Sequence, residues 1–255
     1  MSKPFHTDID EALKVVGTAD RYVVFDIETQ SQPLELLKSS MPIFDASEVK
    51  VGNIKDPALI AAKIDQAKAK HEADYLNKAA LSPVTGKLAA IGLVVIQNGK
   101  AVEMSFLDDG TPEWEVVAIE LFWGHWIKTY SAHRTIWVGH NIFDFDLPWL
   151  VNRSRILNIT IPATVYNFKN NRVYFSEKFA DTRTVWLLGR KPTEVVSNLD
   201  HVSKALGFGG KNGNGAEFGS LLKENPEQAA AYLKQDLDLT AGVAIKLGII
   251  EDLTK

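Results

Sequence analysis

The stretch VVFDIET, residues 23–29, decides the fold because it joins a buried strand to two acids. Its run of large apolar residues is typical of a core strand, where the carboxylates of Asp26 and Glu28 are costly unless their charge is compensated. Side chains two apart on a strand lie on the same side, about 6.5–7 Å apart along it. Two anions at this distance repel unless a cation lies between them, and hard oxygen ligands favour Mg²⁺ or Mn²⁺. An ordinary acidic pair at an exposed strand end is the alternative.

The composition excludes several classes of protein. The chain has 255 residues, of which 45% are hydrophobic, and it contains no cysteine, so disulfides and thiolate metal centres are excluded. No signal-peptide pattern opens the sequence, and its longest uncharged apolar run, LAAIGLVVI, is too short to cross a bilayer. We therefore expect a soluble, intracellular protein without a membrane partner.

The charge is unevenly distributed. The formal net charge is −4, yet the stretch 150–192 carries eight basic residues against two acidic ones, Glu177 and Asp181. Such a stretch forms either a basic face that meets phosphates or a solvated loop face, and charge alone leaves both open.

The order of apolar patterns indicates an α/β domain. Strands are expected at 21–29, 88–96 and 101–107, the last two joined by the hairpin signal Asn98-Gly99, and again at 135–141 and 178–182. A further hairpin is expected from 164–168 and 172–176. Helices are expected at 8–16, 112–130, 146–157, 198–207 and 226–250. Interleaved strands and helices predict one domain, 1–255, built on a mixed sheet with helices on both faces.

Residues 30–87 interrupt this pattern between the first and second strands. Their second half, 56–81, predicts a strong helix whose stripe of Ile60, Ile64, Ala67, His71 and Tyr75 we expect to pack. We interpret the segment as a helical insertion that acts as a lid or a platform for a partner.

Two more acidic clusters follow later in the chain. Asp144 and Asp146 lie where a strand and a turn lead into a helix, and helix capping by Asp is the alternative explanation. Tyr232 and Asp236 are four apart and share a helix face, whereas Asp238 lies about 200° round from Asp236. An ordinary acidic surface helix is the alternative there.

Taken in order, FDIET, HNIFDFDLPWL and YLKQD resemble the three motifs of the DEDD superfamily of 3′–5′ exonucleases, in its tyrosine variant. The chain is most similar to the exonuclease domain of family-B DNA polymerases and its stand-alone, phage-type relatives. The resemblance selects Asp146 over Asp144 and Asp236 over Asp238. The histidine of the other variant is replaced by Ala231, and the insertion has no counterpart in a minimal domain of this family.

The resemblance implies a ribonuclease H-like, five-stranded mixed sheet and two Mg²⁺ or Mn²⁺ ions. Asp26 would bridge the ions, Glu28 and Asp236 would complete the ion nearer the attacking water, Asp146 would hold the second ion, and Tyr232 would orient the water. Four further residues are candidates for substrate binding, with bracing, packing or a mobile exposed loop as the alternatives: Thr29, Asn141, Phe145 and Lys211.

The resemblance also implies an activity. The expected function is 3′–5′ exonucleolytic hydrolysis of DNA, mainly single-stranded, in a bacterial or phage-infected cell, with a replication or recombination protein as a further partner. A 3′–5′ exoribonuclease and a non-catalytic nucleic-acid-binding protein on the same fold are the alternatives. The sequence leaves the oligomeric state open.

Overall fold

The structure, a computed structural model, describes residues 21–130, 135–165 and 178–250. The helix expected at 8–16 and most of the hairpin expected from 164–168 and 172–176 lie outside these residues. No helix within the described ranges is long and apolar enough to span a membrane.

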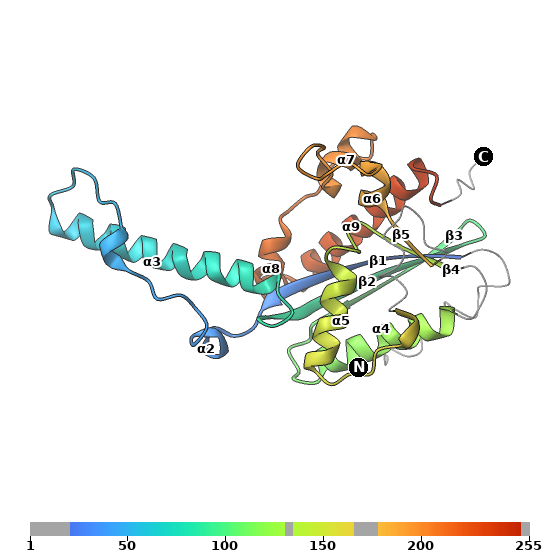
Figure 1. Cartoon of the computed structure of the whole chain (residues 1–255), viewed down its shortest axis with the longest axis horizontal. Helices are drawn as coiled ribbons and strands as arrows, with labels where there is room; N and C mark the ends of the chain where they lie inside the picture. The colour runs from blue at the N-terminus through green and yellow to red at the C-terminus, as the bar shows by residue number, and fades with distance from the viewer. Residues whose placement is uncertain (1–20, 131–134, 166–177, 251–255) are drawn as a thin grey trace.

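Within this part of the chain, five strands form one mixed sheet in the order β3–β2–β1–β4–β5. The central strand β1 (Arg21–Ser31) pairs antiparallel with β2 (Gly86–Gln97), which pairs antiparallel with β3 (Lys100–Leu107). On its other side β1 pairs parallel with β4 (Thr135–Gly139), and β4 pairs parallel with β5 (Phe179–Asp181). The expected mixed five-stranded sheet is confirmed (Figure 1).

The hairpin between β2 and β3 has the geometry that its sequence predicts. Asn98 and Gly99 adopt φ values of 50° and 72°, the left-handed conformation that a tight hairpin turn requires. The antiparallel half of the sheet is therefore set by local chemistry.

Helices cover both faces of the sheet (Figure 1). One face packs on α4 (Trp114–Tyr130) and α5 (Asp146–Ile156), and its core includes Val23, Phe25 and Ile27 of β1. Val24 lies on the opposite face, in a cluster with Leu237 of the long helix α9 (Pro226–Lys246). Because strand side chains alternate, Asp26 and Glu28 share the face of Val24 and project toward α9.

The close approach of α9 to the sheet depends on a glycine. Gly92 pairs with Asp26 in the β1–β2 register, and a Cβ at this position would lie 2.7 Å from Leu237 Cδ1. A larger residue would push α9 away from the strand that carries the acids.

Four short helical elements lie between β5 and α9. The helix expected at 198–207 is confirmed as α7 (Leu199–Ala205), and Gly207 follows it with a φ of 88°. The other three were not expected: α6 (Thr182–Leu187), η3 (Gly215–Glu217) and α8 (Phe218–Glu224). Each is too short to show a helical period in the sequence.

The segment between β1 and β2 forms an arm that extends from the sheet domain (Figure 1). It contains α2 (Leu34–Leu37), η1 (Ala46–Glu48) and α3 (Pro57–Ala80). The expected stripe of α3 packs on the incoming chain: the Tyr75 hydroxyl lies 2.8 Å from Ser40 Oγ, and the His71 ring contacts Phe44.

The base of the arm is bound to the sheet domain by a buried ion pair. Arg153 of α5 donates to both carboxylate oxygens of Glu115 at 2.8 Å and to the carbonyl of Pro83 at 3.1 Å. Glu115 also accepts a 2.7 Å hydrogen bond from the Leu88 amide of β2. This network joins α4, α5, β2 and the turn after α3.

We predict that Arg153→Met lowers the free energy of unfolding by about 3 kcal/mol, because it leaves the Glu115 carboxylate without its partner in a nearly dry site. Urea unfolding measures this change. The control is Arg190→Met, whose exposed pair with Glu194 should cost less than about 0.5 kcal/mol. Equal losses in the two variants would contradict the prediction.

Candidate active site

Three carboxylates from distant parts of the sequence meet beside the sheet. One ligand atom from each of Asp26, Glu28 and Asp236 lies within 4.8 Å of the other two. The first two project from β1 and the third from α9, so the close packing of this helix assembles the cluster. Asp238, which lies round the helix from Asp236, is instead exposed and pairs with Lys234.

Asp146 lies next to this group but outside it. Its carboxylate is 2% exposed and accepts a 3.2 Å hydrogen bond from the Ile27 amide, between the two acids of β1. The capping alternative fails here, because Phe145 is the N-cap residue of α5 and its side chain makes no cap bond. Asp144 is exposed.

Burial raises the pKa of every acid in the site, and repulsion by neighbouring acids adds to the shift of Asp26, Glu28 and Asp146. Loss of water raises the pKa of Asp26 to about 7, and the charge of Asp236 adds to this shift. The pKa values of Glu28 and Asp146 rise well above their usual range, first by burial and then by the charge of Asp26. The acids therefore favour the protonated form unless a cation is present.

Lys211 supplies one cation. Its Nζ lies 2.5 Å from Asp236 Oδ2 and 5.3 Å from the centre of the Tyr232 ring. Burial alone would lower the pKa of this lysine, but the charge of Asp236 and the bond to it raise the pKa above its ordinary value. Lys211 thus stays charged throughout the physiological pH range.

The interpretation of Lys211 as part of a mobile exposed loop was wrong. Its side chain is 25% exposed, and tertiary hydrogen bonds hold the surrounding loop. The Lys211 amide donates to Asp200 Oδ1 at 2.8 Å, and Gln235 of α9 bonds both the Asn212 amide and the Gly210 carbonyl at 3.0 Å. The glycines of the loop are visible in the sequence, whereas the residues that hold the loop in place cannot be recognised from it.

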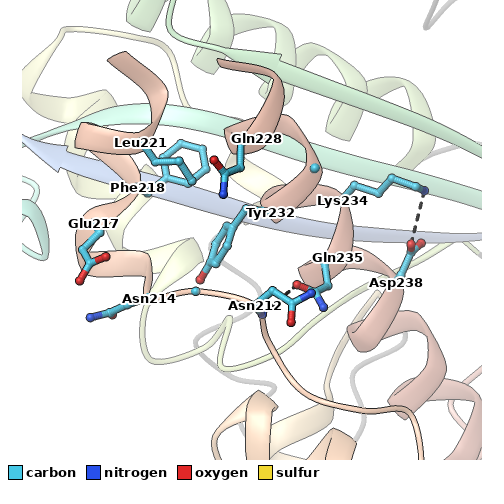
Figure 2. Close-up of a pocket in the computed structure, with 12 residues that line it drawn as sticks. Asn212, Asn214, Glu217, Phe218, Leu221, Gln228, Tyr232, Lys234, Gln235 and Asp238 are labelled. Carbon is cyan, nitrogen blue, oxygen red and sulfur yellow. Dashed lines mark hydrogen bonds and ion pairs between the residues drawn. The ribbon is translucent and has the colours of Figure 1, made fainter. Parts of the chain in front are cut away.

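Tyr232 lies beside the cluster with its hydroxyl directed toward this loop (Figure 2). The hydroxyl and the Oδ1 atom of Asp236 are buried, and neither has a hydrogen-bond partner of ordinary geometry among the described residues. Burial and the charge of Glu28 raise the pKa of Tyr232 above its usual value, so the phenol stays protonated. A Cβ at Gly215 would lie 3.5 Å from Glu28 Oε2 and 3.7 Å from this hydroxyl, so the loop backbone passes in van der Waals range of both groups.

The Tyr232 hydroxyl and Asp236 Oδ1, which lack well-aligned partners in the described part of the chain, suit a bound divalent ion and its water. Buried carboxylate oxygens that converge from three residues are typical ligands of Mg²⁺ or Mn²⁺, and a nearby hydroxyl without a partner can bond a water molecule. The residues present therefore suit the metal that the sequence analysis expects.

The turn that carries Asn141 is held by an acid that sequence reasoning missed. Asp181, at the end of β5, accepts hydrogen bonds from the amides of Asn141 and Phe143 at 2.9 and 3.1 Å, and it also caps α6. Asn141 has a φ of 70°, and its side-chain oxygen accepts a bond from Arg183. Asn141 therefore braces the turn. The only sequence signal for Asp181 was an acid directly before a Thr-Arg-Thr run at a strand end.

The side chain of His140 lies within hydrogen-bond distance of two neighbouring residues, which indicates a structural role. Its ring nitrogens lie 2.9 Å from Thr182 Oγ1 and 2.9 Å from the Ser197 carbonyl. Burial lowers its pKa to about 4, so the ring is neutral near pH 7.

The acids open into a cleft of about 440 Å³. The four candidate substrate-binding residues, Thr29, Asn141, Phe145 and Lys211, all line this cleft. Its far wall was not expected: Asn77, Lys78, Ala80 and Leu81 at the end of α3 also line it. A second hollow of about 560 Å³ lies across Tyr232, between the loop, α8 and α9 (Figure 2).

Three basic residues of the stretch 150–192 have partners among the residues that the structure describes. Arg153 is buried against Glu115, Arg183 bonds Asn141, and Arg190 pairs with Glu194. Of the two interpretations of this stretch, a basic face for phosphates is not favoured by these three residues, because each has an internal or neighbouring partner.

No protein-family model matches the chain, and no curated protein matches its sequence. A family B DNA polymerase from the hyperthermophilic archaeon Pyrobaculum calidifontis matches its structure, with a TM-score of 0.53 and 16% sequence identity over 89% of this chain. The fold is ribonuclease H-like. The match covers 24% of the polymerase, so the chain spans about a quarter of that protein's length. The metal-free form of the Escherichia coli ExoI–ssDNA complex also matches, with a TM-score of 0.36 and 10% identity over 89% of this chain and 40% of that one.

We predict that stabilisation by metal increases with pH. In metal-free protein the raised pKa of Asp26 favours folding below the unfolded value near 4, and this contribution is lost as pH rises through about 7. Metal binding requires the ionised acids. Melting curves at pH 5 to 8 should therefore show a falling Tm in EDTA and a growing rise with Mn²⁺. Asp26→Asn should flatten both trends, and an increment from Mn²⁺ that is the same at pH 5 and pH 8 would contradict the prediction.

We also predict that Lys211→Met destabilises the metal-free protein by about 2 kcal/mol at pH 7, because a charged hydrogen bond to a buried carboxylate is lost. The rise in Tm with Mn²⁺ should become larger, since the ion no longer competes with an ammonium. Lys70→Met, which removes an exposed pair with Asp74, is the control and should change neither quantity. A smaller metal shift in Lys211→Met would show that the lysine assists the ion.

Proposed function

We propose that this chain is a metal-dependent 3′–5′ exonuclease that releases nucleoside 5′-monophosphates from the 3′ end of single-stranded DNA. The observation that carries the proposal is the convergence of Asp26, Glu28 and Asp236 within 4.8 Å, with Asp146 bonded to the same strand. The spacing of these acids in the sequence and the ribonuclease H-like fold support it.

The chemistry needs both a nucleophile and a stabilised leaving group. When bound, a pair of divalent ions supplies both by polarising the attacking water and neutralising charge on the leaving oxygen. Asp26, Glu28 and Asp236 are the residues that would hold the ion nearer the attacking water, and Asp26 and Asp146 would hold the other.

The remaining residues position the reactants. The Tyr232 hydroxyl has no protein partner of ordinary geometry and stays protonated, so it suits a hydrogen bond to the attacking water rather than removal of its proton. Lys211 keeps its charge and lies at the cleft, which suits contact with a phosphate. Thr29, Asn141 and Phe145 complete the substrate surface.

We propose that the site is the tyrosine variant of the DEDD site. The position five residues before Asp236 is Ala231, which is exposed and cannot titrate, so Tyr232 takes the role that histidine has in the other form. DNA is preferred over RNA because the second motif resembles that of family-B polymerases. Matched DNA and RNA oligonucleotides test this choice.

We predict that a 5′-labelled DNA single strand is shortened stepwise from its 3′ end in Mg²⁺ or Mn²⁺ and stays intact in EDTA. Asp26→Ala and Asp146→Ala should each lower kcat by at least ~10³-fold, because each removes an expected metal ligand. Denaturing gels of the labelled products measure both effects. Asp144→Ala, an exposed neighbour, is the control and should retain activity. Intact DNA with degraded RNA would favour an exoribonuclease, and binding without cleavage in Mn²⁺ would favour the non-catalytic alternative.

Tyr232→Phe should lower kcat by about 10- to 100-fold, which is less than either Asp variant, because it removes an orienting bond and leaves the metal ligands in place. Steady-state rates on the same oligonucleotide give the comparison. The reverse ranking would reject the role assigned to Tyr232.

A further inference from the structure

One wall of the cleft that holds the acids belongs to the inserted arm. Asn77, Lys78 and Leu81, at the end of α3, line the same cleft as Asp26, Glu28 and Asp146. A substrate whose 3′ end reaches the acids must therefore lie against this part of the arm.

This wall is fixed in position. Ala79 is buried, its carbonyl accepts a 2.9 Å bond from the Thr85 hydroxyl, and the Thr85 carbonyl accepts a 2.9 Å bond from the Gln32 amide. Gln32 directly follows β1, so these bonds attach the end of α3 to the metal-binding strand. Arg153 of α5, the helix that begins with Asp146, binds the Pro83 carbonyl in the same turn. The wall and the acids are therefore parts of one rigid unit.

The wall contributes an exposed apolar side chain to the lining of the cleft. Leu81 is 62% exposed, and Phe145, which is partly exposed, also lines the cleft. A single exposed leucine is ordinary on a protein surface. This one shares the lining of a cleft of about 440 Å³ with the carboxylates and with two lysines, Lys78 and Lys211. A ligand that offers both a phosphate and an apolar ring face satisfies such a lining.

We infer that Leu81, at the base of the inserted arm, contacts the base of the 3′-terminal nucleotide and so determines how the enzyme holds the end of a strand. Phe145, which also lines the cleft, contacts the same base. The inference rests on the proposed function and extends it, because it gives the arm a part in substrate binding.

The test compares Leu81→Ser with Leu59→Ser. Both leucines lie on exposed surface, 62% and 57% exposed, and Leu59 is at the opposite end of α3. Each protein is assayed in Mn²⁺ on two DNA single strands that differ only in the last nucleotide: one ends in thymidine and the other in an abasic nucleotide.

The expected result is a rise in KM of about tenfold for Leu81→Ser on the thymidine end, with kcat within about twofold of the wild type. The abasic end should raise the KM of the wild type and of Leu59→Ser by the same factor. It should raise the KM of Leu81→Ser by a smaller factor, since only the contact of the base with Phe145 remains to be lost. Loss of fold would change both substrates equally, so the difference between them is specific to a base contact.

Two results would overturn the inference in distinguishable ways. If the wild type degrades the thymidine-ended strand and Leu81→Ser has the same KM as Leu59→Ser, the base contact is rejected and the proposed function stands. If the wild type degrades no strand under any metal condition, the proposed function is rejected and the inference with it.

Discussion

Repulsion among the carboxylates at the end of β1 is the constraint on which the rest of the site depends. Two unit charges 4.8 Å apart repel by about 3 kcal/mol at an effective dielectric constant of about 20, and the cluster contains three such acids. The fold tolerates them because Lys211 partly compensates their charge. It pairs with Asp236, and its charge also acts on Asp26 and Glu28. Raised pKa values show that this compensation is incomplete, and a cluster with incomplete compensation suits a bound cation.

The alternation of β1 lets one strand serve both the core and the site. Val23, Phe25 and Ile27 hold the layer of α4 and α5, and the residues between them face α9. The acids can therefore stay in register only while the apolar residues remain buried. A shift of one residue would place both acids in the aromatic core, at a cost that no ion could offset there. The stability of the core thus fixes the geometry of the site.

The sequence predicted the parts of the molecule that depend on local patterns. Runs of apolar residues predicted β1, β2 and β3, the Asn-Gly pair predicted the hairpin, and Gly207 marked the end of α7. The selection of Asp146 and Asp236 came from a resemblance of ordered motifs, because local chemistry leaves Asp144 and Asp238 equally eligible. Their exposure agrees with that selection.

The features that the sequence did not predict are tertiary contacts. Asp181 looked like an ordinary acid, yet its carboxylate holds the turn after β4. Lys211 lies among glycines, which suggest freedom, while Asp200 and Gln235 from two different helices hold its loop. The basic stretch contained a buried ion pair whose partner, Glu115, lies on another helix. None of these partners is close in sequence, so no local pattern could reveal them.

The topology of the sheet explains why the arm meets the cleft. It leaves the sheet directly after the strand that carries Asp26 and Glu28, and it returns through β2, the antiparallel neighbour of that strand. The register pairs Ser31 with Gly86, so both ends of the arm lie at the edge where the acids project. Any segment inserted at this point must begin and end near the acids of β1, whatever its distal part does. The last turn of α3 therefore lines the cleft that holds these acids, and the bonds of Thr85, Gln32 and Arg153 fix it there.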